Sequence, residues 1–183
     1  LLALAVASLI GVGVVTMLAS TARATTSKND LRRAIIQQQL AVVRLGSLGR
    51  SATMVLATTD SQMVLWKGDL NLNSHPDASE LLSLDWDEAT GKITTYEMPQ
   101  PVAPSDDIEY DVTDDFVNLT KNLIASDIMV GTDRLSHVQA WTTTLDNASV
   151  QSARMITFHL TLDDVTGPQS LDIVTALRAE PSQ

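Results

Sequence analysis

The first 22 residues contain no charged side chain, and this uncharged run constrains the fold more than any other stretch of the chain. At the rise of an α-helix, a segment of this length extends for roughly 33 Å, which is about the thickness of a bilayer's hydrocarbon core. Charged residues begin at Arg23 and become frequent directly afterwards. The sequence therefore predicts an apolar helix that continues without a break into a polar one.

Three interpretations of residues 1–22 compete. One is a cleaved secretory signal peptide, because Ala22-Arg23-Ala24 fits the A-x-A cleavage pattern, although the apolar run exceeds the usual roughly 7–15 residues. Another is a single membrane-spanning anchor. The third is a helix that packs against copies of itself, because small residues recur at a spacing that lets helix backbones approach closely. The predicted assembly residues are Ala3, Ala7, Ser8, Gly11 and Gly13.

Residues 23–58 show a helical pattern, with apolar side chains recurring near one face. The residues of that face are Leu31, Ile35, Val42 and Leu45. Gly46 and Gly49 weaken the helix locally, but no proline interrupts it. We therefore expect one continuous helix over residues 1–58, apolar over 1–22 and amphipathic over 23–58, followed by a β-rich globular head over 59–183.

Within the head, alternation and turn residues predict mostly strands. Strands are expected at residues 62–67, 81–86, 92–97, 135–145, 154–162 and 171–178. Gly91 should supply a positive φ in the turn of the central hairpin. A short helix is expected at residues 113–126, with Thr113 as its N-cap.

The run LLALAVASLIGVGVVTML, continuing into a polar helix, resembles the N-terminal spine of type IV pilins and pseudopilins. The likeness starts past the family's cleavage motif, leading aromatic residue and acidic residue, which do not occur in this sequence. The segment VLWKGDLNLNSHPDASELLSLDWDEATGKI is similar to the head of the larger minor pilins and of J-type pseudopilins of type II secretion. The fold class expected from this layout is α+β and pilin-like, with a long N-terminal hydrophobic α-helical spine packed on an antiparallel β-sheet head.

The resemblance also implies a function. In that family the apolar half-helix anchors the subunit in the inner membrane and then forms the core of an extracellular helical filament at the cell surface. The implied partners are copies of this chain or related pilin subunits. Two alternatives stay open, namely a type II secretion pseudopilin and a membrane-anchored surface binding domain that uses residues 1–22 only as an anchor.

Composition excludes some classes of function. The net charge is -10 and the pI is about 4.5, whereas a nucleic-acid-binding protein needs a basic face, so no nucleic-acid partner is expected. The absence of cysteine excludes disulfides and thiolate metal sites. We find no H-E-x-x-H, G-x-S-x-G, P-loop or Rossmann motif, so neither catalytic residues nor a required cofactor is predicted.

One loop carries a metal-binding pattern. Residues 69–80 place oxygen-bearing side chains at positions 1, 3, 5, 9 and 12 of a calcium loop, with a backbone carbonyl at position 7. The predicted ligands are Asp69, Asn71, Asn73, His75, Asp77 and Glu80. Position 6 is Ser74 instead of the usual glycine, and no helices are expected on either side. The alternative is a polar loop whose side chains hydrogen-bond its own backbone.

Overall fold

The computed structural model describes residues 30, 32–101, 107–163 and 167–179, and the predicted assembly residues Ala3, Ala7, Ser8, Gly11 and Gly13 lie outside this part. Residues 32–51 form a helix. The strands are β1 (Met54–Thr58), β2 (Gln62–Trp66), β3 (Leu81–Asp87), β4 (Lys92–Glu97), β5 (Val130–Leu135), β6 (Val138–Leu145), β7 (Met155–Leu162) and β8 (Gln169–Ala176). The other helical elements are α2 (Phe116–Ala125) and the single turns η1 (Ala78–Glu80) and η2 (Val150–Ser152).

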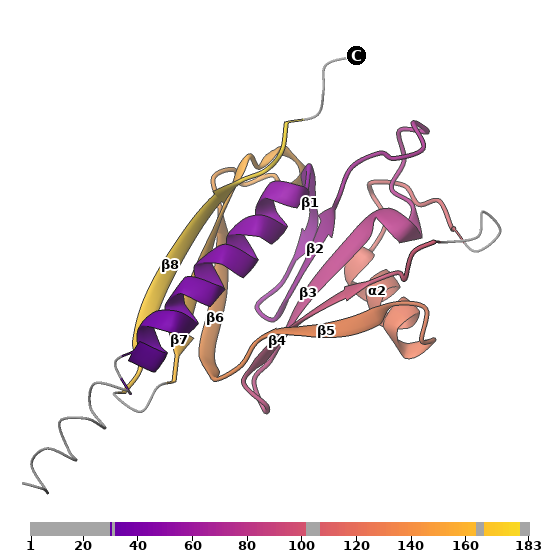
Figure 1. The fold of residues 1–183 in the computed structure, drawn as a ribbon. Coiled ribbons are helices and arrows are strands. Elements are labelled where there is room, and N and C mark those ends of the chain that lie inside the picture. Colours follow the sequence, from indigo (N-terminus) through magenta and orange to yellow (C-terminus); the bar gives the residue numbers. More distant parts are fainter. Residues whose placement is uncertain (1–29, 31, 102–106, 164–166, 180–183) are drawn as a thin grey trace, which may run out of the picture.

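The strands form two antiparallel sheets. The first is a five-stranded sheet with the order β1-β2-β3-β4-β5, and the second is a three-stranded sheet with the order β6-β7-β8. The chain passes from one sheet to the other between β5 and β6, where His137 adopts a φ of 63°. Figure 1 shows the helix of residues 32–51 lying along the three-stranded sheet, while α2 lies on the far side of the five-stranded sheet.

The hydrophobic core has two parts, one on each face of the five-stranded sheet. The larger part joins the helix and both sheets, and includes Leu45, Leu84 and Phe158. The smaller part lies under α2 and includes Phe116 and Trp66. Because β2 is covered on both faces, all five of its residues are buried, and its sequence QMVLW is accordingly a nearly continuous apolar run.

The helix approaches β8 closely because it carries glycine at the contact. A Cβ atom added at Gly49 would lie 2.2 Å from the Thr175 Cγ2 atom, which is impossible without a shift. The Thr175 hydroxyl donates a hydrogen bond of 3.2 Å to the carbonyl of Gly46. Gly49, which weakens a helix in isolation, therefore permits the close approach between this helix and the sheet.

The predicted fold class is wrong. The described residues are mostly β, in two antiparallel sheets, and their α-helices are only the two short ones at residues 32–51 and at α2. In this part of the chain, no helix has the length and apolar character needed to cross a membrane. The amphipathic helix also ends at residue 51 instead of about 58, because Met54–Thr58 pairs with β2 as an antiparallel strand.

Other predicted elements fared differently. The hairpin of β3 and β4 is confirmed, and Gly91 has a φ of 61° in its turn. Of the strand predicted at residues 135–145, Val138–Leu145 forms β6, whereas Leu135 ends β5 in the other sheet and the rest of β5 was not predicted. Helix α2 was predicted, but its N-cap is Asp115, whose side chain accepts a hydrogen bond from the backbone N–H of Asn118, and not Thr113.

Candidate functional site

The loop of residues 69–80 is organised around a buried carboxylate. Glu80 ends the turn η1, and its side chain is 1% exposed. One carboxylate oxygen accepts hydrogen bonds from the Trp66 indole N–H at 2.8 Å and from the Asp77 backbone N–H at 3.3 Å. The other accepts from the backbone N–H of Leu70. Glu80 is thus satisfied by neutral donors on three sides, which offsets the cost of burying its charge.

The first half of the loop is folded by Asx hydrogen bonds. The Asp69 carboxylate accepts from the backbone N–H groups of Asn73 at 3.0 Å and Ser74 at 2.7 Å. The side-chain oxygen of Asn71 accepts a hydrogen bond from the backbone N–H of Asn73 at 3.1 Å, and that of Asn73 accepts one from the backbone N–H of His75 at 2.9 Å. Ser74 has a φ of 65°, so the sharp turn forms without the glycine that a calcium loop carries there.

The second half of the loop is centred on Asp77, which is 3% exposed. Its carboxylate accepts from the side-chain amide of Asn71 at 2.5 Å and from that of Asn73 at 3.2 Å. Burial raises the pKa of Asp77 above its ordinary value, against the effect of the Asn71 amide. The His75 ring lies 4.0 Å from the carboxylate of Glu109, which belongs to a different segment.

The six predicted calcium ligands lie in one loop. The side-chain oxygens of five of them, all but His75, accept hydrogen bonds from backbone and side-chain N–H groups of the same loop or of the adjoining strand. Across the described ranges, no three His, Cys, Asp or Glu side chains gather in a way that could hold a metal ion. This arrangement favours the alternative of a polar loop that hydrogen-bonds its own backbone.

A second candidate site, which the sequence reasoning missed, is the outer surface of the helix of residues 32–51. Its buried stripe contains Ala41 and Leu45. Away from this buried stripe, Ile36, Leu40 and Val43 follow an i, i+4, i+7 spacing and are 49%, 41% and 63% exposed, with Leu40 at the edge nearest the head. We call these three residues the outer stripe. A helix that only covers a domain carries polar residues on this side, so the outer stripe is unusual.

Of the apolar face predicted for this helix, Leu45 is buried, whereas Ile35 and Val42 are 45% and 44% exposed. The outer stripe was not part of that prediction. Because apolar residues occur on both sides of this helix, hydrophobic periodicity could not decide which side faces the head. The 36, 40, 43 spacing was visible and points to a second apolar contact.

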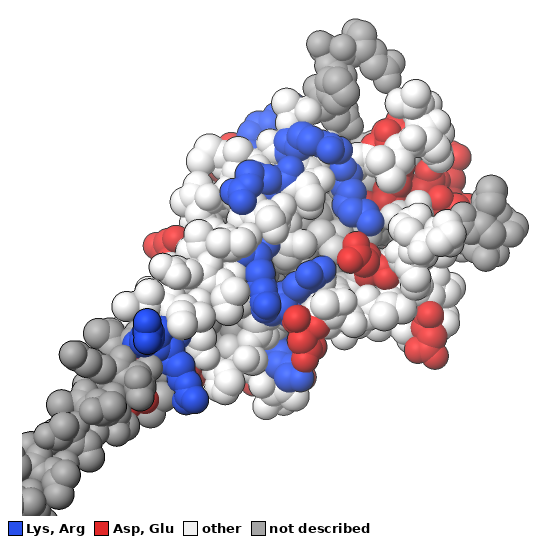
Figure 2. Space-filling model, in the orientation of Figure 1, with Lys and Arg blue, Asp and Glu red and all other residues white. Residues whose placement is uncertain are grey.

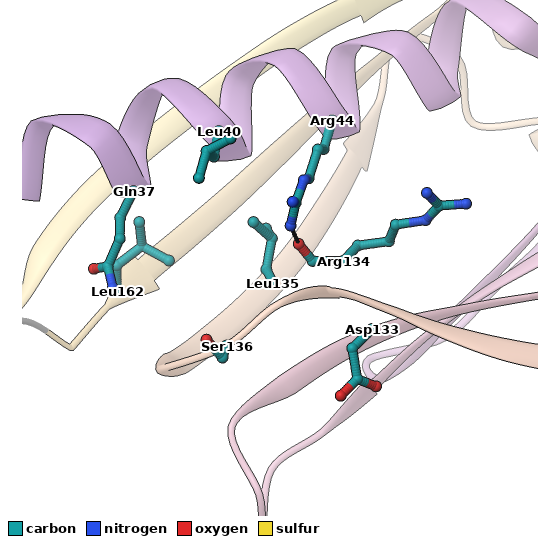
Figure 3. Close-up of a pocket in the computed structure, with 8 residues that line it drawn as sticks. All are labelled: Gln37, Leu40, Arg44, Asp133, Arg134, Leu135, Ser136 and Leu162. Carbon is teal, nitrogen blue, oxygen red and sulfur yellow. Dashed lines mark hydrogen bonds between the residues drawn. The ribbon is translucent and has the colours of Figure 1, made fainter. Parts of the chain in front are cut away.

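A groove of about 210 Å³ runs between this helix and the end of β5. Its lining residues are Gln37, Leu40, Arg44, Asp133, Arg134, Leu135, Ser136 and Leu162. Figure 3 shows Arg44 reaching from the helix to the backbone carbonyl of Arg134, to which it donates a hydrogen bond, while the Arg134 side chain extends away from the groove. The groove is shallow and mixed in character, so it serves as a contact surface more readily than as a substrate pocket.

Charge is distributed unevenly over the head. Figure 2 shows Lys and Arg gathered over the middle of one face, and Asp and Glu gathered toward its right-hand edge. We define the basic face as Arg44, Arg50, Lys67, Arg134 and Arg178. We define the acidic segment as residues 107–115, which contain Asp107, Glu109, Asp111, Asp114 and Asp115. This separation exists although the whole chain has a net charge of -10.

A row of three polar side chains crosses the outer face of the three-stranded sheet. The Asp172 carboxylate lies 2.8 Å from His159 Nδ1, and His159 Nε2 lies 3.0 Å from the Thr144 hydroxyl. The order of groups is that of a nucleophilic triad. However, the row lies on an open sheet surface, with side-chain exposures of 37% for His159 and 69% for Asp172, so it acts as a cross-strand polar contact.

Comparison of the chain with protein-family models, with curated proteins and with solved structures found no match.

Proposed function

We propose that this chain is a structural subunit of a type IV pilus-like filament, in which the N-terminal helices of neighbouring subunits pack against one another. The observation that carries the proposal is the outer stripe, Ile36, Leu40 and Val43, on a helix whose opposite side is already packed on the head. The fold of the head gives the proposal no support, because the predicted pilin-like fold is wrong.

The outer stripe is a surface that favours association. Each of its side chains is about half exposed, and covering it would gain on the order of 1 kcal/mol per residue. Further apolar residues, Ile35 and Val42, flank the stripe on the same helix and are also exposed. A group of exposed apolar side chains on one helix is a candidate surface for association with another protein.

The uncharged sequence of residues 1–22 supports the same function. In the proposed filament it would pack through Ala3, Ala7 and Gly11, and before assembly it would hold the subunit in the inner membrane. A pseudopilin of type II secretion would use the same contacts in a shorter assembly. A surface domain that uses residues 1–22 only as an anchor has no need of apolar side chains at residues 36–43, which follow the uncharged run by more than ten residues.

The test introduces a charge into the outer stripe of the full chain. Ile36→Asp and Val43→Asp place a carboxylate where a neighbouring helix would pack, and Val174→Asp places the same charge on an exposed valine of β8, away from the helix. Assembly is measured by sedimentation and electron microscopy after detergent is removed from purified protein. We expect each stripe variant to raise the protein concentration needed for assembly about tenfold, which corresponds to about 1.4 kcal/mol, while Val174→Asp assembles like the unmodified chain.

Circular dichroism melting of the head controls for folding in each variant. The proposal is wrong if the stripe variants assemble as well as the unmodified chain. It is also wrong if the unmodified chain remains a monomer in lipid at all protein concentrations, because that behaviour identifies a simple membrane anchor.

A further inference from the structure

The five cations of the basic face lie in one connected group. Arg44 contacts the backbone of Arg134, and the Arg178 side chain donates a 2.8 Å hydrogen bond to the carbonyl of Lys67. Arg50 lies in the last turn of the helix, close to Ala52, whose carbonyl accepts a 2.8 Å hydrogen bond from the Arg178 backbone. The group therefore joins the end of the helix to the adjacent edge of the head.

These cations are only partly neutralised by the head itself. Among the described residues, Glu97 is the carboxylate that pairs with them, at 3.6 Å from Lys67 and 3.7 Å from Arg134. Arg44, Arg50 and Arg178 are exposed, and their contacts in the described part of the chain are with backbone carbonyls or solvent. The basic face thus presents an excess of positive charge on a strongly acidic protein.

The acidic segment carries an excess of negative charge. Its carboxylates are held by local N–H and hydroxyl donors: Asp107 accepts from Ser79, Asp111 from Thr113, and Asp115 from Asn118. Hydrogen bonds from Thr113 lower the pKa of Asp111, and those from Asn118 lower the pKa of Asp115, so both are ionised at neutral pH. The segment therefore presents a pre-ordered row of negative charges at the head surface.

We infer that the basic face of one subunit binds the acidic segment of a second copy of this chain. The inference rests on the proposed function and adds to it a contact between heads that accompanies the packing of helices. Two features favour this occupant. The charges are complementary, and both surfaces occur on the same chain, so every subunit carries one of each.

The two surfaces are different regions of the molecule, and this determines the symmetry of the contact. The basic face is made by the second half of the helix, by β5 and by the residues directly after β2 and β8, whereas the acidic segment precedes α2. A contact between two different patches is heterologous, and its repetition generates an open helical assembly unless a ring closes. Head contacts of this kind would fix the register between successive subunits in a filament.

The test is a charge swap in the full chain. One variant carries Arg44→Glu and Arg50→Glu, and the other carries Glu109→Lys and Asp114→Lys. Association is measured in nonionic detergent by fluorescence transfer between labelled subunits, because the detergent covers the apolar helices and leaves the contact between heads. The control carries Arg32→Glu and Arg154→Glu, which reverse two exposed cations that belong to neither the basic face nor the acidic segment.

We expect each swap variant alone to associate at least about tenfold more weakly than the unmodified chain, and the mixture of the two to associate as strongly as the unmodified chain. The control should be unchanged. Raising the salt from about 0.1 M to about 1 M shortens the screening length from about 10 Å to about 3 Å and should abolish association in the unmodified chain. Restoration in the mixture also proves that both variants are folded.

The inference is overturned if the swap variants associate like the unmodified chain or if mixing does not restore association. It is equally overturned if a double-stranded DNA probe binds the basic face, with loss in Arg44→Glu/Arg50→Glu, while the heads do not associate. These outcomes leave the helix contact untouched, since the filament proposal fails only if the outer-stripe variants assemble normally or the unmodified chain does not assemble.

Discussion

Carboxylates only a few residues apart in this protein have opposite surroundings. On β3, burial raises the pKa of Asp85 against a hydrogen bond from the Ser83 hydroxyl, whereas the Thr90 hydroxyl and nearby backbone N–H groups lower the pKa of Asp87. In the loop of residues 69–80, Glu80 is buried but fully provided with N–H donors. The chemistry of each acidic side chain therefore follows from its donors and its burial, and not from its place in a sequence pattern.

The two aspartates on β3 should respond to pH in opposite ways. Because the pKa of Asp85 is raised, burying its charge destabilises the folded state above the ordinary aspartate pKa of about 3.9. Asp85→Asn should therefore raise the melting temperature at pH 7, and the gain should shrink as the pH falls through the raised pKa of Asp85 and vanish below the ordinary value. Asp87→Asn should lower the melting temperature at pH 7, since a lowered pKa contributes stability that disappears at acidic pH.

Thermal melting of the two variants at a series of pH values checks this prediction. Parallel curves for Asp85→Asn and Asp87→Asn would contradict the assignment of the two environments.

The loop of residues 69–80 should need no cation. Its predicted ligand oxygens are already used by backbone and amide donors, so millimolar calcium and a chelator should give equal melting temperatures. Asp69→Ala, which removes two backbone hydrogen bonds, should lower the melting temperature equally in both solutions. A rise with calcium that Asp69→Ala removes would restore the calcium interpretation.

At the scale of elements, the helix of residues 32–51 packs against both sheets and also presents a surface to solvent. Its inner side packs on both sheets, its last turns approach β8 through glycine, and its outer side carries the outer stripe. A neighbouring subunit bound to the outer side of this helix would therefore contact the same helix that packs in the core of the head.

The glycines of this helix give a matched pair of variants. Gly49→Ala should lower the free energy of unfolding by about 1–3 kcal/mol, because the new methyl group would overlap Thr175. Gly46→Ala meets the flexible end of the Arg50 side chain at 3.2 Å and should raise stability by about 0.5–1 kcal/mol, since alanine favours the helix. Denaturant unfolding distinguishes the two, and equal effects would contradict the observed approach of helix and sheet.

Local signals predicted some elements well. The β3–β4 hairpin follows from alternation and from Gly91, both of which act within a few residues. Strand β1 could not be predicted in this way, because MVLAT continues an apolar helical pattern and becomes a strand only by pairing with β2. Strand β5 has the polar sequence VGTDRL and is likewise defined by its partner, β4.

For the candidate sites too, local sequence signals do not show which distant residues come together. The spacing of residues 69–80 predicted a calcium loop, but it could not show that the loop's own N–H groups face its side-chain oxygens. The basic face is assembled from residues far apart in the sequence, such as Arg44, Arg134 and Arg178. Only the fold brings these cations together, so no linear motif could reveal them.

At the scale of the whole molecule, three surfaces lead to the same conclusion. In a single subunit, the apolar side chains of the outer stripe are exposed to solvent, and the basic face and the acidic segment each carry an excess of charge of one sign. An uncharged run of residues 1–22 precedes them in the sequence. Together they support a protein whose working form is an assembly of many copies.

The most direct test of this account measures whether the outer stripe is covered in the assembly. The chain has no native cysteine, so Val43→Cys introduces a unique thiol on the stripe and Glu88→Cys introduces one in the exposed β3–β4 turn. Reaction with a maleimide is followed before and after assembly. The account predicts that Cys at position 43 reacts at least about tenfold more slowly after assembly, equivalent to about 1.4 kcal/mol, while position 88 reacts equally fast in both states. Equal reactivity at position 43 before and after assembly would contradict it.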